Sequence, residues 1–142
     1  MLTVHFTHDY LEGEPGPNFY WRGTISDIMD VITRLHPLGI NNDITIFMNA
    51  IPNVTVTGNY KVLLKSYAGG NILCGMSIDN IIVQLDCSVW RRVLTEIFQL
   101  SFYPSHAYIE FDDLQLSEDA NFIVSSEATV ETGDPLPEST IR

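Results

Sequence analysis

Apolar residues recur with two different periods along this chain, and the same order of periods occurs twice. Segments 19–26 and 81–88 are extended and mainly apolar, and each precedes a stretch with apolar residues at every third or fourth position. That spacing places side chains on one face of a helix. The pattern therefore predicts a strand followed by an amphipathic helix at 19–38, and the same arrangement again at 81–100.

The predicted helices also carry boundary signals. Thr24 and Asp86 occupy the same place in the two segments, and both residue types cap helix N-termini. Asp27 follows Thr24 by three positions, which is a variant of the capping box. A proline and a glycine at 37–39 predict where the first helix ends.

Segments with alternating apolar and polar residues flank both helices, and this period of two predicts β-strands. They lie at 2–6, 43–48 and 60–67 in the first half and at 72–78, 106–111 and 121–126 in the second. The order strand, strand, helix, strand, strand thus occurs twice. We therefore predict a single α+β domain over residues 1–127, built from a duplicated unit at 1–68 and 71–127.

Two helices with one apolar face each suit one side of a sheet. We expect a mainly antiparallel sheet with both helices on one face, halves related by a pseudo-two-fold axis, and an opposite face left open. Residues 128–142 are polar and acidic, contain two prolines and lack apolar periodicity. That composition predicts an acidic, disordered tail.

The charge of the chain is strongly one-sided. Its 142 residues include 18 acidic and 7 basic side chains, which gives a formal net charge of −11. Such a chain lacks the basic surface that phosphate groups require, so we expect no nucleic-acid binding and no docking on an anionic membrane. A basic protein partner fits this field better, although acidity by itself also maintains solubility.

No segment indicates export or insertion into a membrane. The first residues lack the basic and long apolar regions of a signal peptide, and no stretch reaches the roughly 20 apolar residues that span a bilayer. Cys74 and Cys87 are interpreted as buried small hydrophobic residues rather than as a disulfide. We therefore expect a cytoplasmic location.

The segment at 106–112 holds the richest set of chemically active side chains. On a strand, alternate residues share one face. One face carries His106, Tyr108, Glu110 and Asp112, and the other carries Ala107, Ile109 and Phe111. If the apolar set faces the core, the polar row lines the open face, where it could perform acid–base chemistry or bind a cation. The solvated side of an ordinary half-buried strand shows the same pattern.

Aromatic residues supply further candidates. Trp21 could anchor a partner, although core packing also explains it. Phe102 and Tyr103 are the aromatic pair most expected to be exposed, and they could contribute to a homodimer in which the open sheet face packs on itself. His5 and His8 have a spacing that chelates metals on a helix but not on a strand.

Several catalytic motifs are missing from the sequence. It contains no G-x-S-x-G elbow, no glycine-rich phosphate loop and no H-E-x-x-H motif. We therefore predict no cofactor, no metal and no catalytic residue, and expect a non-catalytic protein.

The histidine-led strand at 105–112, the polar stretch after it and the final strand at 121–127 resemble part of the immunity proteins that protect bacteria from their own polymorphic toxins. This resemblance implies a cytosolic inhibitor that binds a toxin domain without catalysis, and it assigns no individual residues. Two functions remain open. One is an acidic binding protein that covers a basic partner such as a nuclease toxin. The other is a small-molecule binder or enzyme, on the open sheet face or between the two halves, that uses His106, Tyr108 and Glu110.

Overall fold

A computed structural model describes residues 1–7, 17–74, 80–103, 106–111, 113, 114, 116 and 120–127. These residues form two α-helices, short 3-10 turns and two mixed β-sheets, so the α+β class is confirmed. The predicted tail at 128–142 lies outside the described residues.

Helix α1 (Ile25–Arg34) begins at the predicted cap. The Thr24 hydroxyl accepts a hydrogen bond from the Asp27 backbone N–H, and the Asp27 carboxylate accepts one from the Thr24 N–H, both at 3.2 Å. This reciprocal pair closes the capping box. The 3-10 turn η1 (His36–Gly39) follows the helix, with Pro37 in its first turn.

Helix α2 (Cys87–Phe98) begins at Asp86, also as predicted. The Asp86 carboxylate accepts hydrogen bonds from the Ser88 hydroxyl at 2.6 Å and from the Ser88 N–H at 2.9 Å. These hydrogen bonds hold the pKa of Asp86 below its ordinary value. The turn η3 (Gln99–Phe102) follows the helix.

The strands form two sheets instead of the expected single one. The five-stranded sheet A has the order β4-β1-β2-β9-β8, and the four-stranded sheet B has the order β3-β5-β7-β6. Sheet A contains β4 (Val54–Val56), β1 (Leu2–Thr7), β2 (Asn18–Thr24), β9 (Asn121–Glu127) and β8 (Ala107–Phe111). Sheet B contains β3 (Ile44–Phe47), β5 (Lys61–Ser66), β7 (Asn80–Leu85) and β6 (Ile72–Cys74). A short turn, η2 (Met48–Ala50), follows β3.

Parallel pairs join hairpin-like units from different halves of the chain. β2 pairs with β9 in parallel and β5 pairs with β7 in parallel, while β1–β2, β8–β9, β3–β5 and β6–β7 are antiparallel. A third parallel pair joins β1 to β4. The sheets are therefore mixed, and the expectation of one mainly antiparallel sheet is not met. Period-two alternation is the same in parallel and antiparallel strands, so it could not distinguish them.

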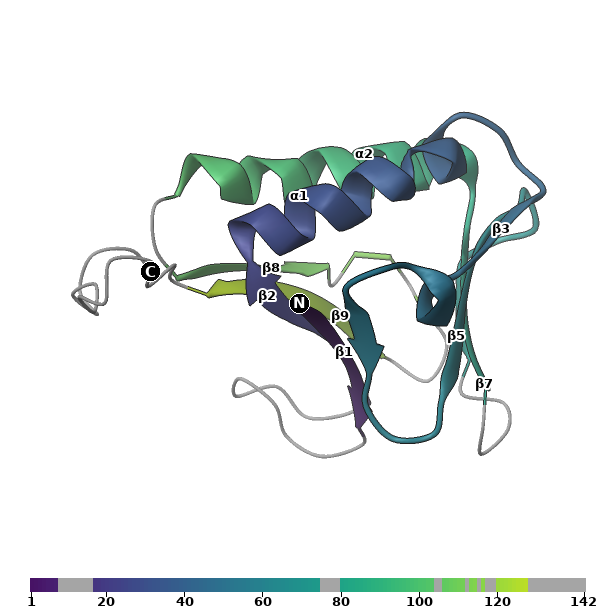
Figure 1. The fold of residues 1–142 in the computed structure, drawn as a ribbon. Coiled ribbons are helices and arrows are strands. Elements are labelled where there is room, and N and C mark those ends of the chain that lie inside the picture. The colour runs from purple at the N-terminus through teal and green to yellow at the C-terminus, as the bar shows by residue number, and fades with distance from the viewer. Residues whose placement is uncertain are drawn as a thin grey trace, which may run out of the picture.

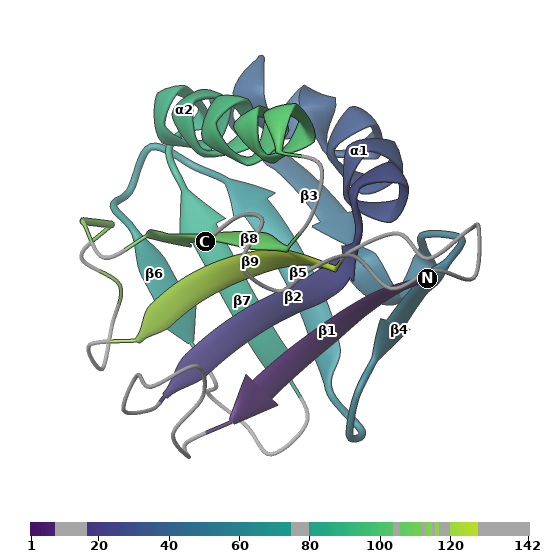
Figure 2. The ribbon, with the colours of Figure 1, turned by 90° about the vertical axis from the view of Figure 1, so that its left-hand side faces the viewer.

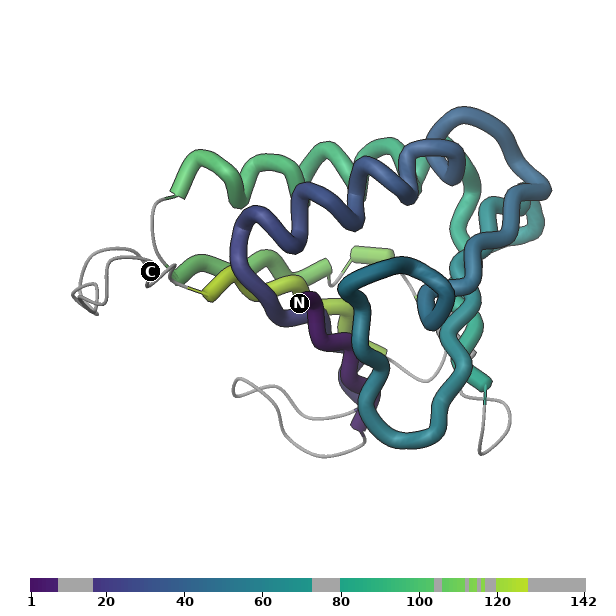
Figure 3. The backbone as a smooth tube through the Cα atoms, in the orientation of Figure 1, coloured from purple at the N-terminus to yellow at the C-terminus, as the bar shows by residue number. Residues whose placement is uncertain are grey.

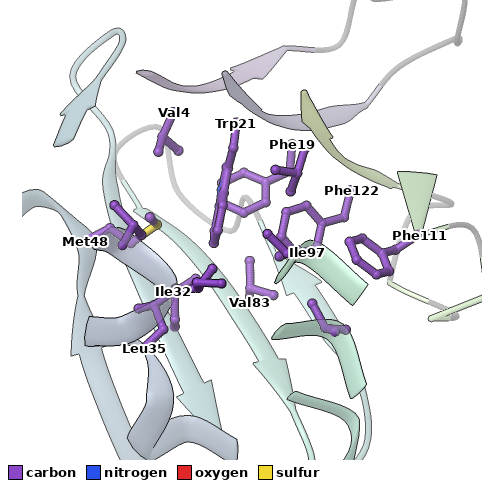
Figure 4. Packing of buried hydrophobic residues seen from close by; sticks show 14 of the residues in the cluster. Val4, Phe19, Trp21, Ile32, Leu35, Met48, Val83, Ile97, Phe111 and Phe122 are labelled. Atoms are coloured by element: carbon purple, nitrogen blue, oxygen red, sulfur yellow. The ribbon is translucent and has the colours of Figure 1, made fainter. Parts of the chain in front are cut away.

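The two helices lie side by side along one side of the molecule (Figure 1), and the backbone trace shows the same arrangement (Figure 3). Figure 2 shows sheet A in front of sheet B, with the strands of the two sheets crossing steeply. One core cluster includes residues from both sheets and both helices. Trp21, Phe19 and Phe122 of sheet A point toward Val83 of sheet B and Ile97 of α2 (Figure 4). Only the outer face of each sheet is therefore turned away from the core.

A buried serine makes a similar contact in each half of the chain. Ser66 ends β5, and its hydroxyl accepts a hydrogen bond from the N–H of Ile44 at 3.1 Å. Ser126 lies near the end of β9, and its hydroxyl accepts one from the N–H of Ala107 at 3.2 Å. Both serines are buried, and both bind the first residue of the antiparallel neighbour. The predicted duplication of the whole unit stays a prediction.

Asp27 ties the start of α1 to the beginning of the chain. One carboxylate oxygen lies 2.9 Å from the amino nitrogen of Met1 and accepts a hydrogen bond from the Thr24 hydroxyl at 2.8 Å. Partial burial alone would raise the pKa of Asp27. The hydrogen bonds from Met1 and Thr24 outweigh burial and hold this pKa below its ordinary value of 3.8.

We expect Asp27→Asn to lower the free energy of unfolding at pH 7 by about 0.5–2 kcal/mol, as is typical of a damaged helix cap. Because the folded-state pKa is lowered, the carboxylate stabilises fully above the unfolded-state pKa and loses its effect as the pH falls through the folded-state pKa. The difference between wild type and variant in urea unfolding should therefore shrink from pH 7 to about pH 2.5.

Asp30→Asn is the matched control, because Asp30 is exposed on the same helix and pairs with Arg34 only at the surface, at 3.5 Å. Such exposed pairs contribute at most about 1 kcal/mol. A loss at Asp27 that stays constant between the two pH values would show that its charge does not stabilise the fold.

Candidate functional site

The outer face of sheet A gathers polar side chains from four strands, and Figure 2 views the molecule from this side. In one row, Arg22 of β2 lies beside Ser125 of β9, which lies beside Tyr108 of β8. The next row on the same face contains His5, Tyr20, Ile123 and Glu110. Glu127 of β9 lies beyond the first row. We refer to these eight residues as the outer face of sheet A.

The β8 side of this face contains the predicted polar residues. Tyr108 is 53% exposed, and Glu110 is partly exposed two positions along the strand. Ala107 and Phe111 are buried on the opposite side, as the alternation predicts. The fourth member of the row, Asp112, lies outside the described residues.

His106 lies just before β8 and has one occupied ring nitrogen. Its Nδ1 lies 2.8 Å from the carbonyl oxygen of Ser126. Because a carbonyl only accepts, the neutral imidazole carries its proton on Nδ1 and leaves Nε2 as an acceptor. Among the described residues, no serine, threonine or cysteine side chain bonds to this imidazole, so the arrangement lacks the nucleophile–base contact of covalent catalysis.

Trp21 lies in the core and has no exposed surface. Its ring contacts Phe19 and Phe122, with centroid distances of 6.0 and 5.1 Å. The interpretation of Trp21 as part of a binding surface is therefore wrong. β2 lies between two neighbouring strands, and its alternation turns Trp21 inward while Tyr20 and Arg22 point outward.

Two parts of the outer face were not predicted from the sequence. Arg22 and Glu127 form an ion pair, with 2.6 Å between Nε and Oε1. The hydroxyl of Ser125 is buried and has no hydrogen-bond partner among the described residues. Both features lie where β2 and β9 pair in parallel. These strands are far apart in the chain, so a local sequence pattern could not predict the contact.

The outer face is not uniformly open. Tyr20, Ile123 and Ser125, in its centre, are buried, although neither Tyr20 nor Ile123 belongs to the main core cluster. Tyr108 and Arg22 on either side are exposed. Arg22 and Tyr108 are therefore the most accessible side chains of the outer face.

The described residues do not form the strongly acidic face that the net charge suggested. They include eight acidic side chains and six Lys or Arg side chains. Five of these eight acids lie within 4 Å of a basic group, namely Asp27, Asp30, Glu96, Asp113 and Glu127. The other ten acids of the chain occupy sequence positions outside the described residues. The excess negative charge therefore comes mainly from those segments.

A hollow of about 460 Å³ lies between α1 with η1 on one side and α2 on the other. Apolar side chains of Ile32, Ile40, Leu94 and Phe98 line it, together with the polar side chains of His36 and Arg91. Its volume is in the range typical of small-molecule sites. A site between the two halves was one of the alternatives predicted from the sequence, but none of the predicted site residues lines this hollow.

Exposed aromatic residues continue from the hollow into η3. Phe102 and Tyr103, predicted to be exposed, are 72% and 46% exposed, which confirms that part of the prediction. The Phe102 ring packs edge-on against Phe98, with 6.0 Å between the ring centroids. The homodimer to which this pair could contribute stays a prediction.

The described part of the chain contains neither a cluster of metal-ligating side chains nor a membrane-spanning helix. It contains no group of three His, Cys, Asp or Glu side chains that could hold a metal ion. His5 instead hydrogen-bonds the Thr57 hydroxyl, and His8 lies outside the described residues. None of the described helices has the length and apolar character needed to span a membrane.

Comparison with protein-family models, with curated proteins and with solved structures finds no match for this chain. Its function therefore has to be inferred from its own residues. Two features qualify as candidate sites: the β8 side of the outer face of sheet A, and the hollow between the helices.

Proposed function

We propose that this protein is a non-catalytic, cytoplasmic binding protein that holds a basic protein partner against the β8 side of sheet A. The proposed role is that of an immunity-type inhibitor of a basic toxin or nuclease domain. The observation that carries the proposal is the position of Tyr108, which is more than half exposed on the edge strand of a sheet in a chain of net charge −11.

Tyr108 has the properties of an interface anchor. Tyrosine presents a large amphipathic ring with few rotatable bonds, and it is enriched among the residues that dominate binding energies. Its backbone is held in the β8–β9 pair, opposite Ser125, so little conformational freedom is lost on binding. Glu110 follows on the same face and provides a negative charge close to the ring.

The charge distribution along the sequence favours a basic partner at this edge. Asp112 follows β8 directly, and the segment at 128–142, which contains three acids and one arginine, follows β9. A nuclease must attract phosphate and therefore carries positive charge at its own site. An acidic chain would be steered toward that site over long distances and would occupy it in place of the substrate.

A second candidate is the small-molecule binder or enzyme around His106, Tyr108 and Glu110. The buried hydroxyl of Ser125, next to Tyr108 in register and without a partner among the described residues, favours this alternative. A small ligand that donated or accepted a hydrogen bond there would remove the cost of a buried, unpaired polar group.

Tyr108→Ala should abolish most of the partner binding. Full-length protein, immobilised through an affinity tag, would be exposed to a lysate of its source cells, and captured proteins would be eluted with rising salt and identified. We expect a basic protein that elutes at high salt. Loss of a central tyrosine anchor typically costs 2 kcal/mol or more, so the variant should bind the purified partner about 30-fold more weakly.

Tyr67→Ala is the matched control, because Tyr67 is 48% exposed but follows β5 in sheet B. It should retain wild-type affinity within about twofold. Equal losses for both variants, or affinity that does not change with salt concentration, would contradict the proposal. Light scattering provides a separate check, since a dimer that Tyr108→Ala converts to a monomer would assign this face to self-association instead.

A further inference from the structure

We propose that the hollow between α1 and α2 binds a small apolar carboxylate, a molecule with one anionic head and an aliphatic or aromatic body. This site is separate from the β8 side of sheet A and does not depend on the function proposed for that face. Arg91 would bind the carboxylate, and the apolar walls of the hollow would cover the body of the ligand.

Arg91, which lines the hollow, lacks the close ion pair that the other described arginines form. Of the four described arginines, Arg22, Arg34 and Arg92 each lie within 4 Å of a carboxylate oxygen. Arg91 has no such partner among the described residues, although acids outnumber bases by 18 to 7 in the sequence. Asp86 acts on Arg91 electrostatically but forms no ion pair with it within 4 Å. A guanidinium that lines an apolar hollow without a carboxylate in direct contact is suited to an anionic ligand.

Arg91 is also oriented before any ligand binds. Its Nε donates a hydrogen bond to the carbonyl oxygen of Gly39 at 2.9 Å, which leaves both terminal nitrogens available for a two-point contact with a carboxylate. Close packing makes this hydrogen bond possible, because a Cβ added to Gly39 would lie 3.1 Å from the Arg91 Cα. A positioned guanidinium loses less entropy on binding than a freely moving one.

His36 provides a second polar group on the wall formed by η1. An imidazole keeps at least one N–H in every protonation state, so His36 can donate a hydrogen bond to an anionic head whether it is neutral or charged. The head of the ligand would therefore lie between His36 and Arg91.

The other residues that line the hollow are mostly apolar and would contact the apolar body of the ligand. Ile32 and Leu94 form part of this apolar wall, and Phe98 and Ile40 are 50% and 52% exposed at its rim. Covering such surface gains roughly 25 cal/mol per Å². An inorganic anion would leave this wall exposed. A polyphosphate would need several cations and would be repelled by a chain of charge −11. A single negative charge on an apolar body fits both parts of the hollow.

The test uses three probes added to the full-length chain: sodium decanoate, the uncharged decanol, and sodium acetate. Calorimetric titration should give saturable one-to-one binding of decanoate, with a Kd on the order of 10–100 μM. Decanol and acetate should each bind at least tenfold more weakly, because each lacks one half of the ligand. Tighter or equal binding of decanol would overturn the role of Arg91.

Three arginine variants distinguish binding in the hollow from binding elsewhere on the surface. Arg91→Gln should weaken decanoate binding at least tenfold, and Arg91→Lys should give an intermediate affinity because it keeps the charge but not the two-point contact. Arg92→Gln, on the next residue of α2, should bind decanoate within twofold of wild type. If Arg91→Gln and Arg92→Gln lost similar decanoate affinity, binding would depend only on the overall charge of the protein, and the proposal would be overturned.

Phe98→Ala tests the apolar wall and is expected to fold, because half of the side chain is exposed. It should weaken decanoate binding about fivefold, whereas Phe47→Ala, on the comparably exposed Phe47 of β3, should not. Unsaturable binding, or unchanged affinity in both Phe98→Ala and Arg91→Gln, would overturn the proposal. Tighter binding of a peptide ending in a free leucine carboxylate than of decanoate, lost in Arg91→Gln, would likewise overturn it and assign the hollow to a protein terminus.

Discussion

Phe122→Ala should reduce the free energy of unfolding by about 3–5 kcal/mol. The Phe122 side chain has no exposed surface, and its ring contacts those of Phe19, Trp21 and Phe111, with centroid distances of 5.2, 5.1 and 5.2 Å (Figure 4). Truncation would leave a cavity where β2, β9 and β8 meet. It would also remove three aromatic contacts, which contribute about 0.5–1.5 kcal/mol each beyond their buried area.

Equilibrium unfolding in urea measures this loss. Phe98→Ala removes the same side chain from a half-exposed position on α2 and should cost less than about 1 kcal/mol. If the two variants lost similar free energies, the aromatic cluster would not be the centre of the core. Because β8 and β9 lie over this cluster, Phe122→Ala should also weaken the partner binding proposed for Tyr108 through a less ordered sheet.

Trp90→Phe should cost about 2–4 kcal/mol, whereas Trp21→Phe should cost about 1 kcal/mol. Both indoles are completely buried, so the cavity created is similar in the two variants. Trp90 Nε1 donates a hydrogen bond to the carbonyl oxygen of Lys65 at 2.7 Å. Trp21 Nε1 has no partner among the described residues, so its removal eliminates a buried, unpaired donor and offsets part of the cavity cost.

The two tryptophan variants are compared by urea unfolding at one pH and temperature. The Trp90 hydrogen bond joins α2 to β5, so its loss should loosen the contact between the helices and sheet B. Equal destabilisation by the two variants would show that the Lys65 contact contributes no net stability.

Local structure was largely readable from the sequence. Ile28, Ile32 and Leu35 of the apolar stripe predicted for the first helix are buried, and Thr24 and Asp86 cap the two helices as their positions predict. The alternation in β8 correctly assigned its inward and outward faces. Each of these features depends on residues within about four positions of one another, where spacing alone determines which side chains meet.

The position of Trp21 could not be predicted from the spacing of neighbouring residues. Its strand has an aromatic or apolar residue at three successive positions, Phe19, Tyr20 and Trp21, so the pattern does not say which of them face the core. The neighbours of β2 decide the question, since β1 and β9 place Tyr20 on the outer face and Trp21 between the sheets.

The sequence by itself determined the α+β class, the two capped helices, the order of strands and helices except for the unpredicted β4, and the polar row that contains Tyr108 and Glu110. Only the tertiary structure decided that the strands form two mixed sheets, that Trp21 belongs to the core, and that Arg91 lines a hollow with no described carboxylate within 4 Å. Spacing and capping operate between near neighbours in the chain. β2 pairs with β9, and η1 packs against α2, although these segments are far apart in the sequence. These contacts form because they bury the apolar core as a whole.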